Sequence, residues 1–153
     1  MHKQIEALFE DAESRYLMPE ELNVLSQYVD SVPSRLDVYR TLRDHEIQIM
    51  QPIADQLQRE FPQVPVDKLE RSIKNGLLAL RYCAMAMLLN DESFLQDRVR
   101  GWLDQTSKVY DTHAIDTSLY RQLSQQLDQR LPPQQAALIQ PLIKVVQDLL
   151  AQS

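Results

Sequence analysis

Cysteine, glycine and long apolar runs are all scarce in this chain. Cys83 is the only cysteine among 153 residues, which excludes an internal disulfide framework and favours a reducing compartment. No apolar run approaches the ~20 residues that cross a bilayer, because the most apolar stretch, from Leu77 to Leu89, is interrupted by Arg81. The amino-terminal residues lack the apolar core of a signal peptide. We therefore expect a cytoplasmic protein with no transmembrane segment.

The chain also lacks an excess of basic residues and any recognisable catalytic motif. Its 16 Lys and Arg residues are outnumbered by 22 Asp and Glu residues, giving a formal net charge of −6. Nucleic acids are bound by basic faces, so we expect no nucleic-acid partner. No nucleophile motif, glycine-rich phosphate loop or metal quartet stands out, so we expect no enzyme. His2, His45 and His113 have no ligand spacing and are expected at the surface rather than on a haem.

What the chain does contain predicts one all-helical domain. Two glycines and frequent Leu, Gln, Glu, Arg and Ala favour helices, and β-branched residues never alternate as in a strand. Prolines mark the expected joints, including a break at 32–34 and a kink or boundary near Gln51 caused by Pro52. A polar segment is expected at 111–117. The seven or eight expected helices span, approximately, His2 to Ser14, Pro19 to Ser31, Arg35 to Phe61, Val66 to Asn90, Glu92 to Tyr110, Ser118 to Arg130 and Gln134 to Ala151.

Two motifs resemble those of phycobiliproteins, the light-harvesting subunits of phycobilisomes. Residues 11–22 read Asp-Ala-Glu-Ser-Arg-Tyr-Leu-Met-Pro-Glu-Glu-Leu, similar to the family's Asp-Ala-Glu-x-Arg-Tyr-Leu-Ser-Pro-x-Glu-Leu. Residues 80–82 match the Leu-Arg-Tyr of its central helix. The resemblance covers nearly the whole chain and is closest to the allophycocyanin type. It implies one globin-like domain over 1–153, with residues 1–31 as an added helical pair for subunit contact and 34–153 as the globin-like core.

The resemblance also locates a pigment position that has changed. The family's central helix resembles Cys-x-Arg-Asp-x-x-x-x-Leu-Arg-Tyr, in which the cysteine carries a bilin by a thioether and the aspartate accepts hydrogen bonds from pyrrole nitrogens. Here Ser72 stands at the cysteine position, Asn75 at the aspartate position and Lys74 at the arginine position. A serine hydroxyl lacks the nucleophilicity of a thiolate at neutral pH, and an amide cannot balance a protonated tetrapyrrole. We therefore expect no covalent bilin and no other cofactor.

Further departures from the family point the same way. The segment between Pro62 and Ser72 is shorter than the family's bilin-covering loop, and Ser107 stands where the family usually has tyrosine. Cys83 is the only thiol that could replace the lost attachment point. It lies eleven residues beyond Ser72, about 16 Å along a helix, and its apolar neighbours predict a small buried side chain instead.

A second set of matching residues concerns subunit contact. In the family, an aspartate of the first helix often pairs with the arginine of the Leu-Arg-Tyr helix on the partner subunit, and Asp11 and Arg81 occupy these positions. With Tyr16, these residues are expected at an interface whose apolar part comes from nearby Leu8, Phe9 and Leu17. The alternative is a solvated Asp11 and an ion pair of Arg81 within its own chain, which would contribute only ~0–1 kcal/mol.

Together these features predict a pigmentless interaction protein of the photosynthetic antenna. Its expected partners are phycobiliprotein-type subunits or a second copy, its location the cytoplasm including the thylakoid surface, and its role structural or regulatory. One alternative is a carrier that holds a bilin or another tetrapyrrole without a covalent bond, with Lys74 near a propionate and Asn75 near a nitrogen; an antenna subunit that binds pigment remains a further alternative. A haem-free sensor globin has the fold but no sequence feature of its own.

Overall fold

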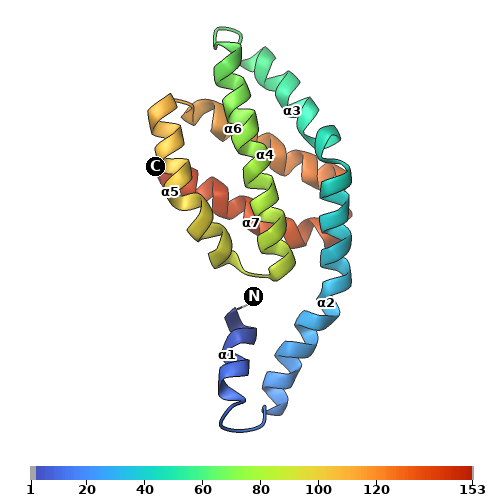
Figure 1. Cartoon of the computed structure of the whole chain (residues 1–153). Helices are drawn as coiled ribbons and strands as arrows, with labels where there is room; N and C mark the ends of the chain where they lie inside the picture. The colour runs from blue at the N-terminus through green and yellow to red at the C-terminus, as the bar shows by residue number, and fades with distance from the viewer. Residues whose placement is uncertain (1–2, 153) are drawn as a thin grey trace.

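The computed structural model describes residues 3–152, apart from the side chains of residues 104 and 106–108, and this part of the chain forms helices without any strand (Figure 1). The all-helical prediction is therefore confirmed. None of these helices combines the length and apolar character needed to span a bilayer. In chain order they are α1 (Lys3–Asp11), α2 (Pro19–Asp44), α3 (Glu46–Glu60), α4 (Val66–Leu89), α5 (Glu92–Tyr110), α6 (His113–Arg130) and α7 (Pro133–Gln152).

The predicted break at 32–34 is wrong, because α2 continues through Pro33 and ends only at Asp44. A proline inside a helix removes one hydrogen bond and costs about 3 kcal/mol. Packing outweighs that cost here: Pro33 itself is exposed, while Val38 and Leu42 of the next two turns are buried in the core. The boundary lies at His45, which caps α2 through its N–H to the Thr41 carbonyl.

The predictions for α3 and α6 need related corrections. Pro52 lies inside α3 and marks no boundary. The predicted polar segment at 111–117 is also wrong, because α6 begins at His113 rather than Ser118. Asp111 adopts a positive φ of 51° that turns the chain, and the helix starts directly afterwards. His45 and His113 are exposed, as expected, whereas His2 lies outside the described residues.

Helix α4 is the centre of the molecule, as predicted, and packs against α2, α3, α5, α6 and α7. Its inward face combines large side chains with small ones: Leu80 and Met87 are buried, and so are Ala79, Cys83 and Ala86. Small residues let neighbouring helices approach closely, so one helix can contact five others. The remaining core comes from α3, α6 and α7, including Ile53, Leu57, Leu119, Leu123, Leu127, Ile139 and Ile143.

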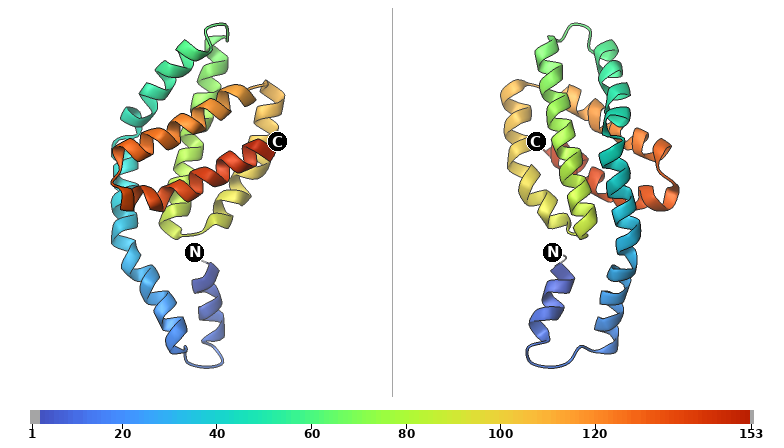
Figure 2. Two further views of the ribbon diagram at one scale, coloured as in Figure 1. Left: turned by 180° about the vertical axis from the view of Figure 1, so that it is seen from behind. Right: turned by 45° about the vertical axis from the view of Figure 1, so that its right-hand side comes forward.

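The amino-terminal helices stand apart from this body. Figures 1 and 2 show α1 and the first half of α2 as a hairpin that projects from the end of the bundle, with the long α2 running from the hairpin into the core. We call residues 3–31 the N-terminal hairpin. Its α1 ends at Asp11, three residues earlier than predicted, and α1 packs mainly against α2. The hairpin is thus held to the body chiefly by the continuity of α2.

Gly76 sets the distance between α4 and α6. A Cβ atom on Gly76 would lie 2.7 Å from Cδ2 and 3.0 Å from Cδ1 of Leu119, and Leu119 is fully buried. Those methyl groups are surrounded by core side chains and have little room to move. Gly101 on α5 offers a matched contrast, because nothing lies within 4 Å of a Cβ built there.

We expect Gly76→Ala to lower the free energy of unfolding by about 1–2 kcal/mol, because overpacking a core costs about 1–3 kcal/mol and the gain in helix propensity recovers up to about 1 kcal/mol. The control Gly101→Ala should raise it by about 0.5–1 kcal/mol through propensity alone. Urea denaturation of both variants measures the two effects. Stabilisation by Gly76→Ala would show that α4 and α6 are not in close contact at this point.

Candidate functional site

The N-terminal hairpin exposes an unusual share of its apolar side chains. Of the described residues from 3 to 34, only Ile5 is buried. Tyr16 is 97% exposed, and Phe9 and Leu22 are each 51% exposed. Met18 and Val29 are more than half exposed as well. A cluster of this kind on a protein surface marks a site of contact with another molecule, and it includes the predicted interface residue Tyr16.

Ion pairs within the hairpin hold its turn in place. The guanidinium of Arg15 donates to both oxygens of Glu21, at 2.7 Å and 3.1 Å, and Oε1 of Glu21 also accepts the backbone N–H of Met18 at 2.9 Å. Asp11 lies 3.6 Å from the same Arg15. Hydrogen bonding from Arg15 lowers the pKa of Glu21. The turn between α1 and α2 therefore presents its apolar side chains from a defined backbone.

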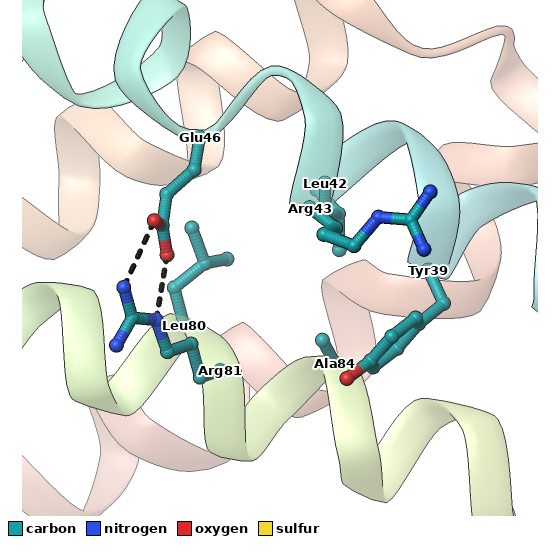
Figure 3. A pocket seen from close by; sticks show the side chains of 7 residues that line it. All are labelled: Tyr39, Leu42, Arg43, Glu46, Leu80, Arg81 and Ala84. Carbon is teal, nitrogen blue, oxygen red and sulfur yellow. Dashed lines mark hydrogen bonds and ion pairs between the residues drawn. The ribbon is translucent and has the colours of Figure 1, made fainter.

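Arg81 has a partner within its own chain. Its Nε and Nη2 donate to the two carboxylate oxygens of Glu46 at 2.8 Å and 3.0 Å (Figure 3), and this hydrogen bonding raises the pKa of Arg81. The pair borders a hollow of about 290 Å³ between α2, α3 and α4, also lined by Tyr39, Leu42 and Arg43. Asp11 pairs with Arg15, so the structure does not bring Asp11 and Arg81 together within one chain.

The three residues of the predicted pigment position do not form one site. Ser72 is 1% exposed, and its Oγ makes no hydrogen bond. Lys74 and Asn75 instead line an open hollow on the surface of α4, together with Asp67, Glu70 and Arg71. The guanidinium of Arg71 lies 3.8 Å from the ring centre of Tyr110 on α5. The side chain of Ser107 lies outside the part of the chain that the structure describes.

A buried acidic residue beside Ser72 was missed by sequence reasoning. Asp116 on α6 is 5% exposed and accepts a hydrogen bond of 2.7 Å from Thr112. Burial raises the pKa of Asp116, and the Thr112 hydrogen bond opposes this shift in part. Ser72 lies close enough to Asp116 to stabilise its charged carboxylate, although the Oγ of Ser72 is not placed to form a hydrogen bond. The position of Ser72 is therefore part of the packing between α4 and α6.

Cys83 is buried in the core, and burial raises its pKa far above the ordinary value for a thiol. A protonated, inaccessible thiol is a poor nucleophile, and the prediction of a small buried side chain at Cys83 is confirmed. No group of three or more metal-ligating side chains occurs among the described residues.

Comparison with known proteins agrees with this architecture. A family model described as Phycobilisome protein matches residues 8–150, which is most of the chain. The chain belongs to the phycobilisome protein family. Comparison with curated protein sequences gave no match. The predicted globin-like fold is thereby confirmed, because members of this family share it.

Family membership also sets the general context of function. Members associate with the light-harvesting antenna, and they assemble into oligomers with one another. They are structural proteins of light harvesting rather than enzymes. The particular similarity to allophycocyanin-type subunits remains a prediction.

We expect the native protein to be inert toward a thiol reagent such as iodoacetamide, because Cys83 is buried and protonated. One thiol should react per chain after denaturation. Ser72→Cys should add a second thiol that is equally silent in the folded protein, because position 72 is 1% exposed. Mass spectrometry counts the adducts. Modification of the native variant at residue 72 would mean that this position opens to solvent.

Asp116→Asn should stabilise the protein near neutral pH. The folded-state pKa of Asp116 is raised, so the folded protein binds this proton more tightly than the unfolded chain does. The charged carboxylate therefore lowers the free energy of unfolding at pH values above the raised folded-state pKa, and this loss of stability disappears below the ordinary carboxyl pKa of about 3.9. The stability gain of the variant should therefore shrink as the pH falls through this window. Urea denaturation at a series of pH values tests it, and a gain that grows in acid would refute the assignment.

Proposed function

We propose that this protein is a pigmentless interaction subunit of the phycobilisome antenna and binds its partner through the N-terminal hairpin. The supporting observation is that Ile5 alone is buried among the described residues from 3 to 34. The partner is a phycobiliprotein-type subunit or a second copy of this chain, at the thylakoid surface. Its role is structural or regulatory: it occupies a subunit position or adjusts assembly and takes up no covalent bilin.

The energetics of the hairpin favour such a partner. Helix α1 has nine residues, fewer than the ~12–15 at which an isolated helix is even marginally stable in water. Full burial of a side chain such as Phe9 or Leu22 contributes about 1.5–3 kcal/mol. The exposed apolar side chains of the hairpin can supply this stabilisation only against another molecule. The hairpin therefore gains order as it binds.

The charge of the hairpin selects for a basic partner surface. Residues 3–31 contain seven acidic side chains and two basic ones, a net charge of −5 out of −6 for the whole chain. Two such hairpins would repel each other if they packed together. The Arg81 hollow is lined by two cations, Arg43 and Arg81, which pair within the chain with Asp44 and Glu46. An arrangement in which Asp11 of one subunit approaches Arg81, or its equivalent, on the other therefore requires Asp11 to compete with Glu46 for that guanidinium.

The absence of a covalent pigment is supported by the position of Ser72, whose hydroxyl lies in the packing between α4 and α6. A non-covalent tetrapyrrole carrier is the second candidate function. It is favoured by the open hollow at Lys74 and Asn75, where Lys74 and Arg71 supply two cations beside the acids Asp67 and Glu70. Absorbance titration with free bilin separates the two candidates: a saturable spectral shift that Lys74→Glu abolishes would support the carrier.

Phe9→Asp and Leu22→Asp should each weaken association at least tenfold, because either change places a charge in the apolar part of the interface. Val66→Asp is the matched control: Val66 is 57% exposed, similar to Phe9 and Leu22 at 51%, and is the first residue of α4. Figure 1 shows that α4 begins at the end of the bundle opposite the hairpin. Sedimentation of the protein alone, and mixed with antenna subunits, measures the effect. Equal behaviour of all three variants would sink the proposal.

A double-mutant cycle tests the ion pair across the interface. Asp11→Asn and Arg81→Gln should show a coupling energy of about 1 kcal/mol or more in the dissociation constant if the two side chains meet between subunits. Glu46→Gln is the control, because it breaks the pair within the chain and leaves Arg81 charged. It should leave association unchanged or stronger. A coupling energy of zero would place Asp11 and Arg81 apart.

A further inference from the structure

Arg35 is a buried cation with neutral hydrogen-bond partners. It lies on α2 just beyond Pro33 and is 9% exposed. Its Nη1 donates to the Met87 carbonyl of α4 at 2.6 Å, and its Nε donates to Oγ of Ser31 at 2.9 Å. Both acceptors are uncharged. These two hydrogen bonds leave part of the five-donor fork of this guanidinium for another acceptor.

No ion pair between described residues includes Arg35, whereas Arg15, Arg43 and Arg81 each bind a carboxylate. A buried charge without a counterion is costly. Burial accordingly lowers the pKa of Arg35, and only the smaller influence of Tyr28 opposes the shift. An anion at this position would remove much of the cost.

A hollow of about 220 Å³ adjoins Arg35, between the N-terminal hairpin and the end of α4. Its polar lining consists of Arg35 and the amide and hydroxyl side chains of Gln4, Gln27, Tyr28, Ser31 and Asn90. No acidic side chain is among the described residues that line it. A second hollow, also lined by Arg35 and Asn90, does contain acids, Asp91 and Glu92. The two hollows that Arg35 lines therefore differ in charge, and only the first suits an anion.

We propose that the hollow between the hairpin and α4 binds a small free oxyanion, a phosphate or carboxylate, on the guanidinium of Arg35. The planar fork of arginine matches the oxygens of these anions, and the amide groups of Gln27 and Asn90 can donate to the outer oxygens. Because the lining comes from α1, α2 and Asn90, the residue that caps the end of α4, the occupant contacts both the hairpin and the body. The anion thereby fixes the hairpin in its orientation.

The negative net charge of the chain opposes this binding only weakly. Anions are repelled by the acidic hairpin at long range, but this repulsion is screened beyond about 8–10 Å at physiological salt. The short-range attraction of Arg35 remains. We expect a dissociation constant on the order of 1 mM, which is weak by the scale of protein ligands.

The test uses Gln27→Glu, which places a carboxylate in the same hollow and supplies the counterion covalently. Gln125→Glu is the matched control, because Gln125 is exposed on α6 and does not line the hollow. All three chains are titrated with sodium phosphate at constant ionic strength and at a protein concentration where sedimentation shows monomers. Thermal unfolding and the NMR resonance of the Arg35 Nε–H group are followed.

The wild-type chain and Gln125→Glu should gain about 3–5 °C in Tm at ten times the dissociation constant, and the Arg35 resonance should shift with the same saturation. Gln27→Glu should start at a higher Tm than wild type and show no saturable response. An equal rise in Tm in all three chains would be explained by exclusion of the kosmotropic phosphate ion from the protein surface, and it would overturn the proposal. An Arg35 resonance that ignores phosphate but moves with protein concentration would overturn it too, because a neighbouring chain would then supply the carboxylate.

Discussion

Arg35 ties the long helix α2 to the carboxyl end of α4 through the hydrogen bond from its Nη1 to the Met87 carbonyl. The shape of the molecule depends on this junction. On one side of it, Val38 and Leu42 carry α2 into the core. On the other side, the same helix leaves the core and holds the N-terminal hairpin away from the body (Figure 2). The unbroken helix keeps the hairpin, with its exposed apolar side chains, away from the body.

The central helix places the residues of the predicted pigment position in two different environments. The packing of α4 against α6 requires Gly76 opposite Leu119, and Ser72 lies one turn earlier on the same helix, buried near Asp116. Lys74 and Asn75 face solvent instead. The residues at the family's pigment position are thus divided between interior and surface. The proposed association through the hairpin uses none of them.

Helical periodicity predicted much of this fold. The bounds of α5 were predicted correctly, and those of α4 and α7 were predicted to within one residue at each end. The break predicted at Pro33 is wrong because the burial of apolar side chains in the next turns outweighs the cost of a proline on the exposed face of the helix. The start of α6 was missed because Asp116 is polar, and its buried hydrogen bond to Thr112 leaves no trace in hydropathy. Among the site residues, the exposure of Tyr16 agrees with an interface, but Glu46, the partner of Arg81, is 35 residues away in sequence, and no local pattern connects them.

The central claim is that this chain associates through its hairpin and carries no covalent pigment. Native mass spectrometry of the protein purified from cells that make bilins tests both parts at once. The account predicts an unmodified chain, in a complex with a second copy or with another antenna subunit. A bilin adduct on the chain, or a chain found only as a monomer, would contradict it.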